Sequence, residues 1–175
     1  TKFDSNGVFR VELMFNPDEH AEFLQRLDNL ADSAVEDAKE ELKEKRPQDV
    51  EKVMRKDPYE KVYDDEGNPT GMVKVKFKMN HIINTDDGQI ELTPDLFDAK
   101  GNNVDREKVS IRGGSELRVN FTPRPYYMAS TKQAGISNQL NAVQIIKLVE
   151  SYGDADYYGF DKENDGFDAS DLEAS

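Results

Sequence analysis

The chain has 175 residues, a formal net charge of −13 and an apolar content of 36%. That length suffices for one compact domain with a core and hardly for two. The absence of cysteine excludes disulfides and thiolate metal sites, and two histidines far apart in the sequence argue against a zinc site. Because no apolar run approaches the roughly 18 residues of a membrane span and no signal-peptide core is evident, we expect an intracellular protein without membrane contact.

The N-terminal part predicts a strand followed by one long helix. Apolar and polar residues alternate over residues 7–15, which is typical of a half-buried strand. Asn16 and Pro17 then predict a helix start, with Asn16 as the N-cap and Pro17 at the first helical position. Apolar residues recur at helical spacing up to about Arg46, so we expect an amphipathic helix of roughly 28–30 residues.

A second alternating segment carries three lysines. Residues 73–79 read Val-Lys-Val-Lys-Phe-Lys-Met. On a strand, the apolar side chains would point to one face and Lys74, Lys76 and Lys78 to the other. Such lysines commonly decorate a solvent face and discourage edge-to-edge aggregation, but they also form a cationic ridge suited to a polyanion.

Polar turn sequences divide the rest of the chain into short strands. Further strands are predicted over residues 90–97, where Pro94 weakens the pattern, and over residues 117–121 and 139–149. Several short strands with one long helix predict a mainly β fold, namely an OB-fold-like five-stranded barrel with an inserted helix.

The stretch from residue 109 to residue 150 is locally basic in an acidic chain. Its basic residues are Arg112, Arg118, Arg124, Lys132 and Lys147. Tyr126 and Tyr127 follow Arg124 closely, and unpaired bases need flat apolar faces for stacking beside cations for phosphates. Neighbouring strand residues face opposite ways, so we expect one tyrosine to be buried. Tyr126 shares parity with Arg118 and Arg124 and is therefore the candidate for stacking.

The C-terminal segment has a different composition. Residues 151–175 hold eight Asp or Glu residues against one Lys. Periodicity stops after Tyr152, which predicts a folded domain over residues 1–152 and an acidic flexible tail over residues 153–175. The tail residues expected to contact partners are Asp154, Asp156, Phe160, Asp161, Asp165, Phe167, Asp168 and Asp171.

Other site chemistries find little support. Residues 161–166 resemble the opening of an EF-hand loop, but position twelve is Leu172 and not Glu, and no flanking helices are evident. Gly113 and Gly114 indicate a turn or bulge and not a phosphate-binding loop. We therefore expect no catalytic residues, no metal and no cofactor.

The order of the segments carries a family resemblance. The matching elements are residues 7–13, the long acidic helix, residues 75–78, 98–101, 111–119 and 125–126, and the acidic tail. Over roughly residues 7–152 the chain resembles the single-stranded-DNA-binding proteins of T-seven-like short-tailed phages. The resemblance implies an OB-fold barrel, sequence-tolerant binding of single-stranded DNA, and a tail that contacts the replisome.

The same resemblance, carried over by position, places Lys76, Lys78 and Tyr126 on DNA-contact sites. Asn80 stands where the family has an aromatic residue, and Met128 where it has a tryptophan.

The pattern and the resemblance together predict a non-enzymatic single-stranded-DNA-binding protein of phage replication and recombination, acting in the host cytoplasm. The expected DNA-binding residues are Lys74, Lys76, Lys78, Arg112, Arg118, Arg124, Tyr126, Tyr127 and Lys132. The tail would compete with DNA and contact the phage DNA polymerase and helicase-primase, while a homodimer is left open. The alternatives are an acidic protein–protein adaptor or DNA mimic, and a Ca²⁺-responsive adaptor.

Overall fold

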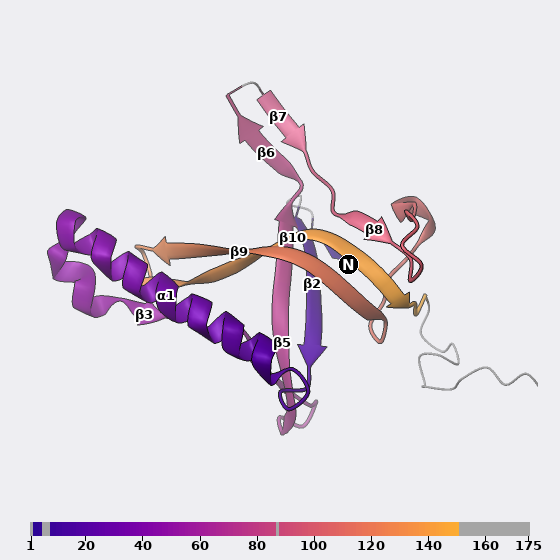
Figure 1. Ribbon diagram of the computed structural model, residues 1–175, viewed down its shortest axis with the longest axis horizontal. Coiled ribbons are helices and arrows are strands. Elements are labelled where there is room, and N and C mark those ends of the chain that lie inside the picture. Colours follow the sequence, from indigo (N-terminus) through magenta and orange to yellow (C-terminus); the bar gives the residue numbers. More distant parts are fainter. Residues whose placement is uncertain (1, 5–7, 87, 151–175) are drawn as a thin grey trace, which may run out of the picture.

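The computed structural model describes residues 2–4, 8–86 and 88–150. The expected class is confirmed, since strands dominate and one long helix lies among them (Figure 1). The helices are α1 (Ala21–Lys45) and the short 3-10 helices η1 (Pro47–Lys52) and η2 (Arg106–Lys108). The strands are β1 (Lys2–Asp4), β2 (Val8–Phe15), β3 (Met54–Arg55), β4 (Glu60–Tyr63), β5 (Pro69–Asn80), β6 (Ile82–Thr85), β7 (Gly88–Glu91), β8 (Asp95–Phe97), β9 (Glu116–Met128) and β10 (Gln133–Lys147).

One strongly bent sheet forms the body of the fold. It has eight strands, with the path β1-β2-β5-β10-β3, while β4 pairs with β5, and β8 and β9 pair with β10. The count exceeds the expected five because short strands extend the long ones at their edges. β2 and β5 are antiparallel, β10 joins β5 in parallel, and β9 and β10 cross β2 and β5 steeply (Figure 1). The separate β6–β7 hairpin projects from the body.

The core lies on one face of this sheet. Alternation turns Val11 of β2 and Val75 and Phe77 of β5 inward, as the sequence predicted, and all three are buried. α1 packs against β9 and β10, and its apolar stripe, which includes Leu27, joins the same core. The ring centroids of Phe121 of β9 and Phe77 lie 4.9 Å apart. Burying each large side chain stabilises the fold by about 1.5–3 kcal/mol, so alternation on the strands fixes which face is left to solvent.

The helix begins later than predicted. Pro17 lies in a separate turn, in which Asn16 Oδ1 accepts from the Asp18 amide at 3.0 Å and the Asn16 carbonyl accepts from the His20 amide at 3.1 Å. The helix starts at Ala21 and ends at Lys45, close to the predicted end. In the part of the chain that the structure describes, no helix is long and apolar enough to span a bilayer.

β9 and β10 are longer than predicted. β9 continues through Pro123 and Pro125, where a strand was not expected. Its described pairing is with β10 alone, and proline is tolerated on an edge strand because one side needs no ladder hydrogen bonds. A register shift at Asn141 bends the pair, and Nδ2 of the Asn141 side chain donates to Asn120 Oδ1 at 2.9 Å and Thr122 Oγ1 at 3.0 Å.

Candidate nucleic-acid interface

A row of polar side chains crosses the sheet on the face opposite the core. Arg10 of β2 pairs with Lys78 of β5, Lys78 with Gln139 of β10, and Gln139 with Thr122 of β9. Paired residues on neighbouring strands point to the same face. Arg124 shares that face, and its Nε donates to Gln139 Oε1 at 3.2 Å. We call Arg10, Lys78, Gln139 and Arg124 the cross-sheet row.

Two lysines of the predicted ridge have carboxylate neighbours. The Lys76 Nζ lies 2.7 Å from Glu60 Oε1, and the Lys74 Nζ lies 3.2 Å from Glu12 Oε2. The pKa of Glu60 is below its usual range, first because Lys76 donates a hydrogen bond to it and further because Lys76, Lys74 and Lys56 are close, although partial burial opposes the shift. Each ion pair is solvent-exposed and therefore worth at most about 1 kcal/mol, so a phosphate can replace the carboxylate at little cost.

Lys78 differs from the other two lysines because its cross-strand partner is Arg10. No salt bridge joins Lys78 to a carboxylate among residues 8–86 and 88–150. Like charges directly opposite each other on a sheet repel, and an anion that lies between them relieves the repulsion. Lys78, with Arg10 opposite it, is therefore well placed to contact a phosphate.

Tyr126 and Tyr127 lie on opposite faces of β9, as the strand pattern predicts. Tyr126 lies on the same face as Arg124, whereas Tyr127 points to the other side of β9. Both rings are half-buried, but the Tyr127 hydroxyl oxygen is fully buried and has no hydrogen-bond partner in the described part of the chain. The Tyr126 ring is consequently the one that a base could cover from solvent.

Gly135 of β10 makes room for Tyr126. It pairs with Tyr126, and a Cβ atom on Gly135 would lie 3.0 Å from Lys56 Cβ, 3.2 Å from the Lys56 carbonyl oxygen and 3.4 Å from Tyr126 Oη. Only glycine leaves this space, so the start of the Lys56 side chain and the Tyr126 hydroxyl can both approach β10 here. Lys56 is exposed, and a cation and a ring from the same part of the sheet are a suitable combination for one nucleotide.

The remaining predicted residues lie apart from the row. Arg118 shares the outer face further along β9 and is exposed, while Arg112 precedes β9 and its Nε donates to the Glu150 carbonyl. Lys132 lies in the turn between β9 and β10 with φ of 56°, and its Nζ is 2.8 Å from Oδ2 of the buried Asp49. The structure thus brings Lys132 to a structural carboxylate and not to the cross-sheet row.

Sequence reasoning missed Arg10, Gln139 and Lys56 as members of this surface. Arg10 had the right strand parity, but only the register between β2 and β5 places it beside Lys78. The predicted tail contacts and the EF-hand-like segment lie outside the described residues. Within the described residues, no group of three or more His, Asp or Glu side chains could hold a metal ion.

Comparisons with known proteins bear on the family and the fold of the chain. The profile of the family described as "Single-stranded DNA-binding protein, Bacteriophage T7" matches residues 1–148. Among solved structures, the crystal structure of gp2.5, a single-stranded DNA binding protein encoded by bacteriophage T7, shares the fold with a TM-score of 0.63 and 23% identity, over 85% of this chain and 80% of that chain. No curated protein sequence matches the chain. Because the family match spans most of its length, this chain belongs to the T7-type phage single-stranded DNA-binding protein family.

Proposed function

We propose that the chain is a sequence-tolerant single-stranded-DNA-binding protein of phage replication and recombination. The observation that supports this most is the cross-sheet row, in which Arg10, Lys78 and Arg124 gather on the face opposite the core and continue to Tyr126. The matching family is one of DNA-binding proteins and not of enzymes.

The binding mode follows from the chemistry of that face. Phosphates would lie against Arg10, Lys78 and Arg124, joined by Lys74 and Lys76 when their carboxylate partners are displaced. A base would stack on Tyr126. Phosphate contacts and stacking carry no base-edge readout, so the interaction would tolerate any sequence. A duplex keeps its bases stacked inside and could not offer one to Tyr126, which favours single strands.

The acidic segment has a role in the same proposal. Residues 1–152 would form the OB-fold domain and residues 153–175 a tail that competes with DNA and contacts the phage polymerase and helicase-primase in the host cytoplasm. Its support is charge complementarity between the eight acidic residues of this segment and the cations Arg10, Lys78 and Arg124 of the cross-sheet row.

Titration of labelled oligo-dT at increasing salt tests the proposal. Affinity should fall with a linear log–log slope because bound cations release counterions from the DNA. A flat profile, or equal affinity for duplex DNA, would remove the single-strand proposal.

Deletion of residues 153–175 tests the role of the tail separately. The truncated protein should bind oligo-dT more tightly, and unchanged or weaker affinity would remove competition by the tail.

A further inference from the structure

Two exposed methionines flank the first residue of β10. Gln133 pairs with Met54 of β3 on one side and with Met128 of β9 on the other. Met54 is 54% exposed and Met128 is 48% exposed. Paired residues on neighbouring strands point to the same face, so the two thioether side chains stand on either side of the Gln133 amide. We call Met54 and Met128 the methionine pair.

The contacts of Arg55 show which way the methionine pair points. Arg55 of β3 contacts Asp28 and Asp32 of α1 at 2.5 Å and 2.7 Å. Because side chains alternate along a strand, Met54 points away from α1. Met128 shares its face through the common partner Gln133. The methionine pair therefore lies on the side of the sheet that α1 leaves uncovered.

The methionine pair continues the cross-sheet row beyond Tyr126. Arg124, Tyr126 and Met128 are alternate residues of β9 and share one face. The pairing of β9 with β10 is regular from Gln133 to Leu140, so no register shift turns the pair away from the row. A cation, an aromatic ring and a thioether thus follow one another along β9 at intervals of two residues, or roughly 7 Å.

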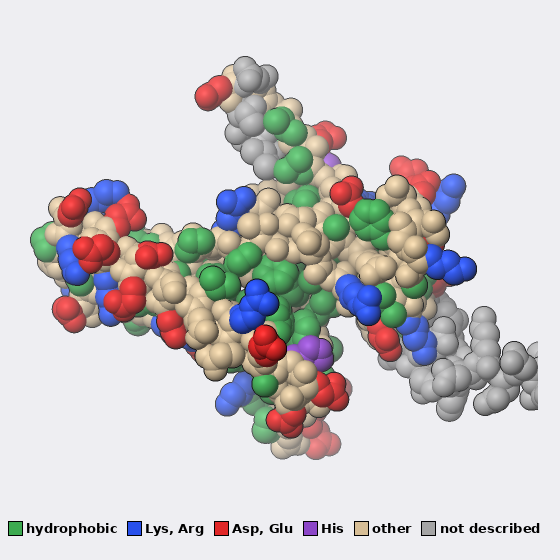
Figure 2. All heavy atoms as spheres, viewed as in Figure 1, with side chains coloured by type: hydrophobic (Ala, Val, Ile, Leu, Met, Phe, Trp, Pro, Cys, Tyr) green, Lys and Arg blue, Asp and Glu red, His purple; other side chains and the backbone are tan. Residues whose placement is uncertain are grey.

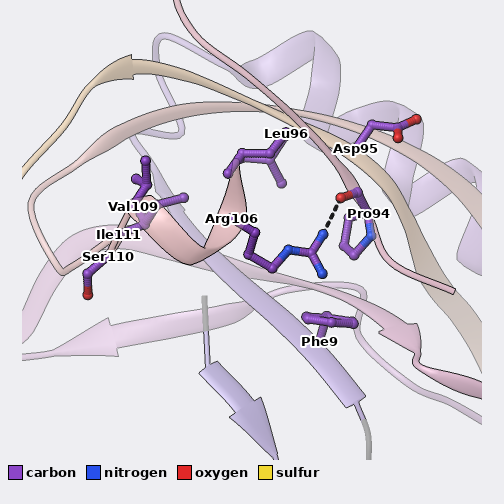
Figure 3. A pocket seen from close by; sticks show the side chains of 9 residues that line it. Phe9, Pro94, Asp95, Leu96, Arg106, Val109, Ser110 and Ile111 are labelled. Carbon is purple, nitrogen blue, oxygen red and sulfur yellow. Dashed lines mark hydrogen bonds between the residues drawn. The ribbon is translucent and has the colours of Figure 1, made fainter. Parts of the chain in front are cut away.

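The cavity beside Phe9 is a less suitable place for a base. It has a volume of about 210 Å³ and lies between β2, β8, β10 and the loop that contains η2 (Figure 3). The guanidinium of Arg106 already lies 4.6 Å from the Phe9 ring centroid and donates to the Pro94 carbonyl (Figure 3). Phe9 is buried and precedes Arg10 on β2, so the cavity and the cross-sheet row lie on opposite faces of the sheet.

The chemistry of methionine suits contact with a base of any sequence. Its thioether is flexible and polarisable and makes favourable contacts with aromatic rings. Two such side chains can adjust to purines and pyrimidines alike. The interval of roughly 7 Å between Tyr126 and Met128 is about twice the rise of about 3.4 Å per base in a duplex strand. Neighbouring bases can therefore occupy both places only in an unstacked single strand.

We propose that the methionine pair is a second base-contact site, in which a base lies over Gln133 against the thioethers of Met54 and Met128. This site rests on the proposed function and extends it by one nucleotide beyond the base on Tyr126. Lys56 is exposed and follows Met54 by two residues, so its ammonium would contact the phosphate that joins the two nucleotides.

NMR of the full chain, labelled with carbon-13 at the methionine methyl groups, tests this site. The chain has five methionines, and single Met→Leu variants assign their signals. Oligo-dA is the probe because purine rings have strong ring currents. Its addition should shift the methyl signals of Met54 and Met128 upfield. The signal of Met14, which is 63% exposed at the end of β2, is the internal control and should not shift in this way.

Affinity provides a second readout. Met54→Ala/Met128→Ala should lower oligo-dA affinity about fivefold, because contacts between a thioether and an aromatic ring are individually modest. The log–log salt slope should stay the same, since no charge is removed. Met14→Ala is the matched control and should bind as the wild type does.

The possible failures of this site and of the proposed function are distinguishable. Binding of oligo-dA without a shift at Met54 and Met128 would remove only the methionine site. Methyl shifts that appear on concentrating the protein, and that DNA does not change, would identify a second copy as the occupant and would also overturn it. No binding of oligo-dA or oligo-dT even at low salt would remove the proposed function and this site with it.

Discussion

Two regions of the molecule place lysine and arginine side chains in opposite electrostatic surroundings. At the helix–sheet junction, where α1 and η1 meet β3, Arg55 contacts Asp28 at 2.5 Å and Asp32 at 2.7 Å, and Lys132 contacts Asp49 at 2.8 Å. In the cross-sheet row, Lys78 lies opposite Arg10, and the described side-chain partner of Arg124 is the neutral amide of Gln139.

The difference teaches that neither net charge nor a count of lysines locates a binding surface. Cations at the helix–sheet junction fix α1 to the sheet, because carboxylates from α1 and η1 surround them. Figure 2 likewise shows acidic and basic side chains interspersed along α1. The cations of the cross-sheet row lie beside one another and beside a neutral amide, and such a grouping produces a local positive field that attracts a polyanion to an acidic protein.

The largest effect on DNA binding is expected from removing the row's cations. Arg10→Ala/Lys78→Ala/Arg124→Ala should lower oligo-dT affinity on the order of 100-fold at 0.1 M salt and flatten the log–log salt slope by roughly 2, because each phosphate contact with a single strand contributes about 0.7. Fluorescence titration at several salt concentrations measures both quantities. Lys43→Ala on α1 is the matched control and should change neither. An unchanged log–log salt slope in the triple variant would contradict the distinction between the cross-sheet row and the helix–sheet junction.

A smaller loss of oligo-dT affinity is expected from Tyr126→Ala. Removing one stacked base costs about 1–3 kcal/mol, on the order of a tenfold loss of affinity, and the salt slope should stay the same because the ring carries no charge. Tyr126→Phe should bind as the wild type does. Tyr63→Ala, which removes a ring that is 56% exposed on β4, is the control. Equal losses for Tyr63→Ala and Tyr126→Ala would show that Tyr126 has no special position.

Gly135→Ala should lower oligo-dT affinity a few-fold because it displaces the Tyr126 ring. The new Cβ atom would meet Lys56 and the tyrosine hydroxyl, so the ring must shift. A double-mutant cycle of oligo-dT affinities isolates this route, because the substitution should have no further effect when Tyr126 is already alanine. Additive losses would instead indicate a general distortion of β10.

The smallest effect on DNA binding, with a clear effect on stability, is expected from Lys132→Ala. The hydrogen bond from Lys132 lowers the pKa of Asp49, so this pair stabilises the fold at neutral pH and ceases to do so as falling pH protonates Asp49. The variant should have a lower Tm at pH 7, and the difference from wild type should shrink towards pH 3. Thermal unfolding by circular dichroism measures it. A pH-independent difference would contradict the assignment, as would a large loss of oligo-dT affinity.

The sequence predicted those features that depend on local alternation. Lys74, Lys76 and Lys78 share one face because every second residue of β5 is apolar, and the outward position of Tyr126 follows from the parity of β9. The strand over residues 7–15 and the end of α1 were predicted on the same grounds.

Features that depend on contacts far apart in the chain could not be predicted. The register that places Arg10 beside Lys78 joins strands about 70 residues apart, and Lys132 reaches Asp49 across 83 residues. The late start of α1 reflects a competing turn at Asn16. The length of β9 could not be predicted because proline is tolerated only on an edge strand, and whether β9 lies at an edge depends on the whole sheet.

Photo-crosslinking of the full chain to oligo-dT that carries 5-bromodeoxyuridine tests the central claim most directly. The claim predicts an adduct on the peptide that contains Tyr126, which high salt and unlabelled oligo-dT should both suppress. Adducts found only on α1 or on the turn that contains Lys132 would contradict it, because they would place the DNA at the helix–sheet junction, where carboxylates hold the cations.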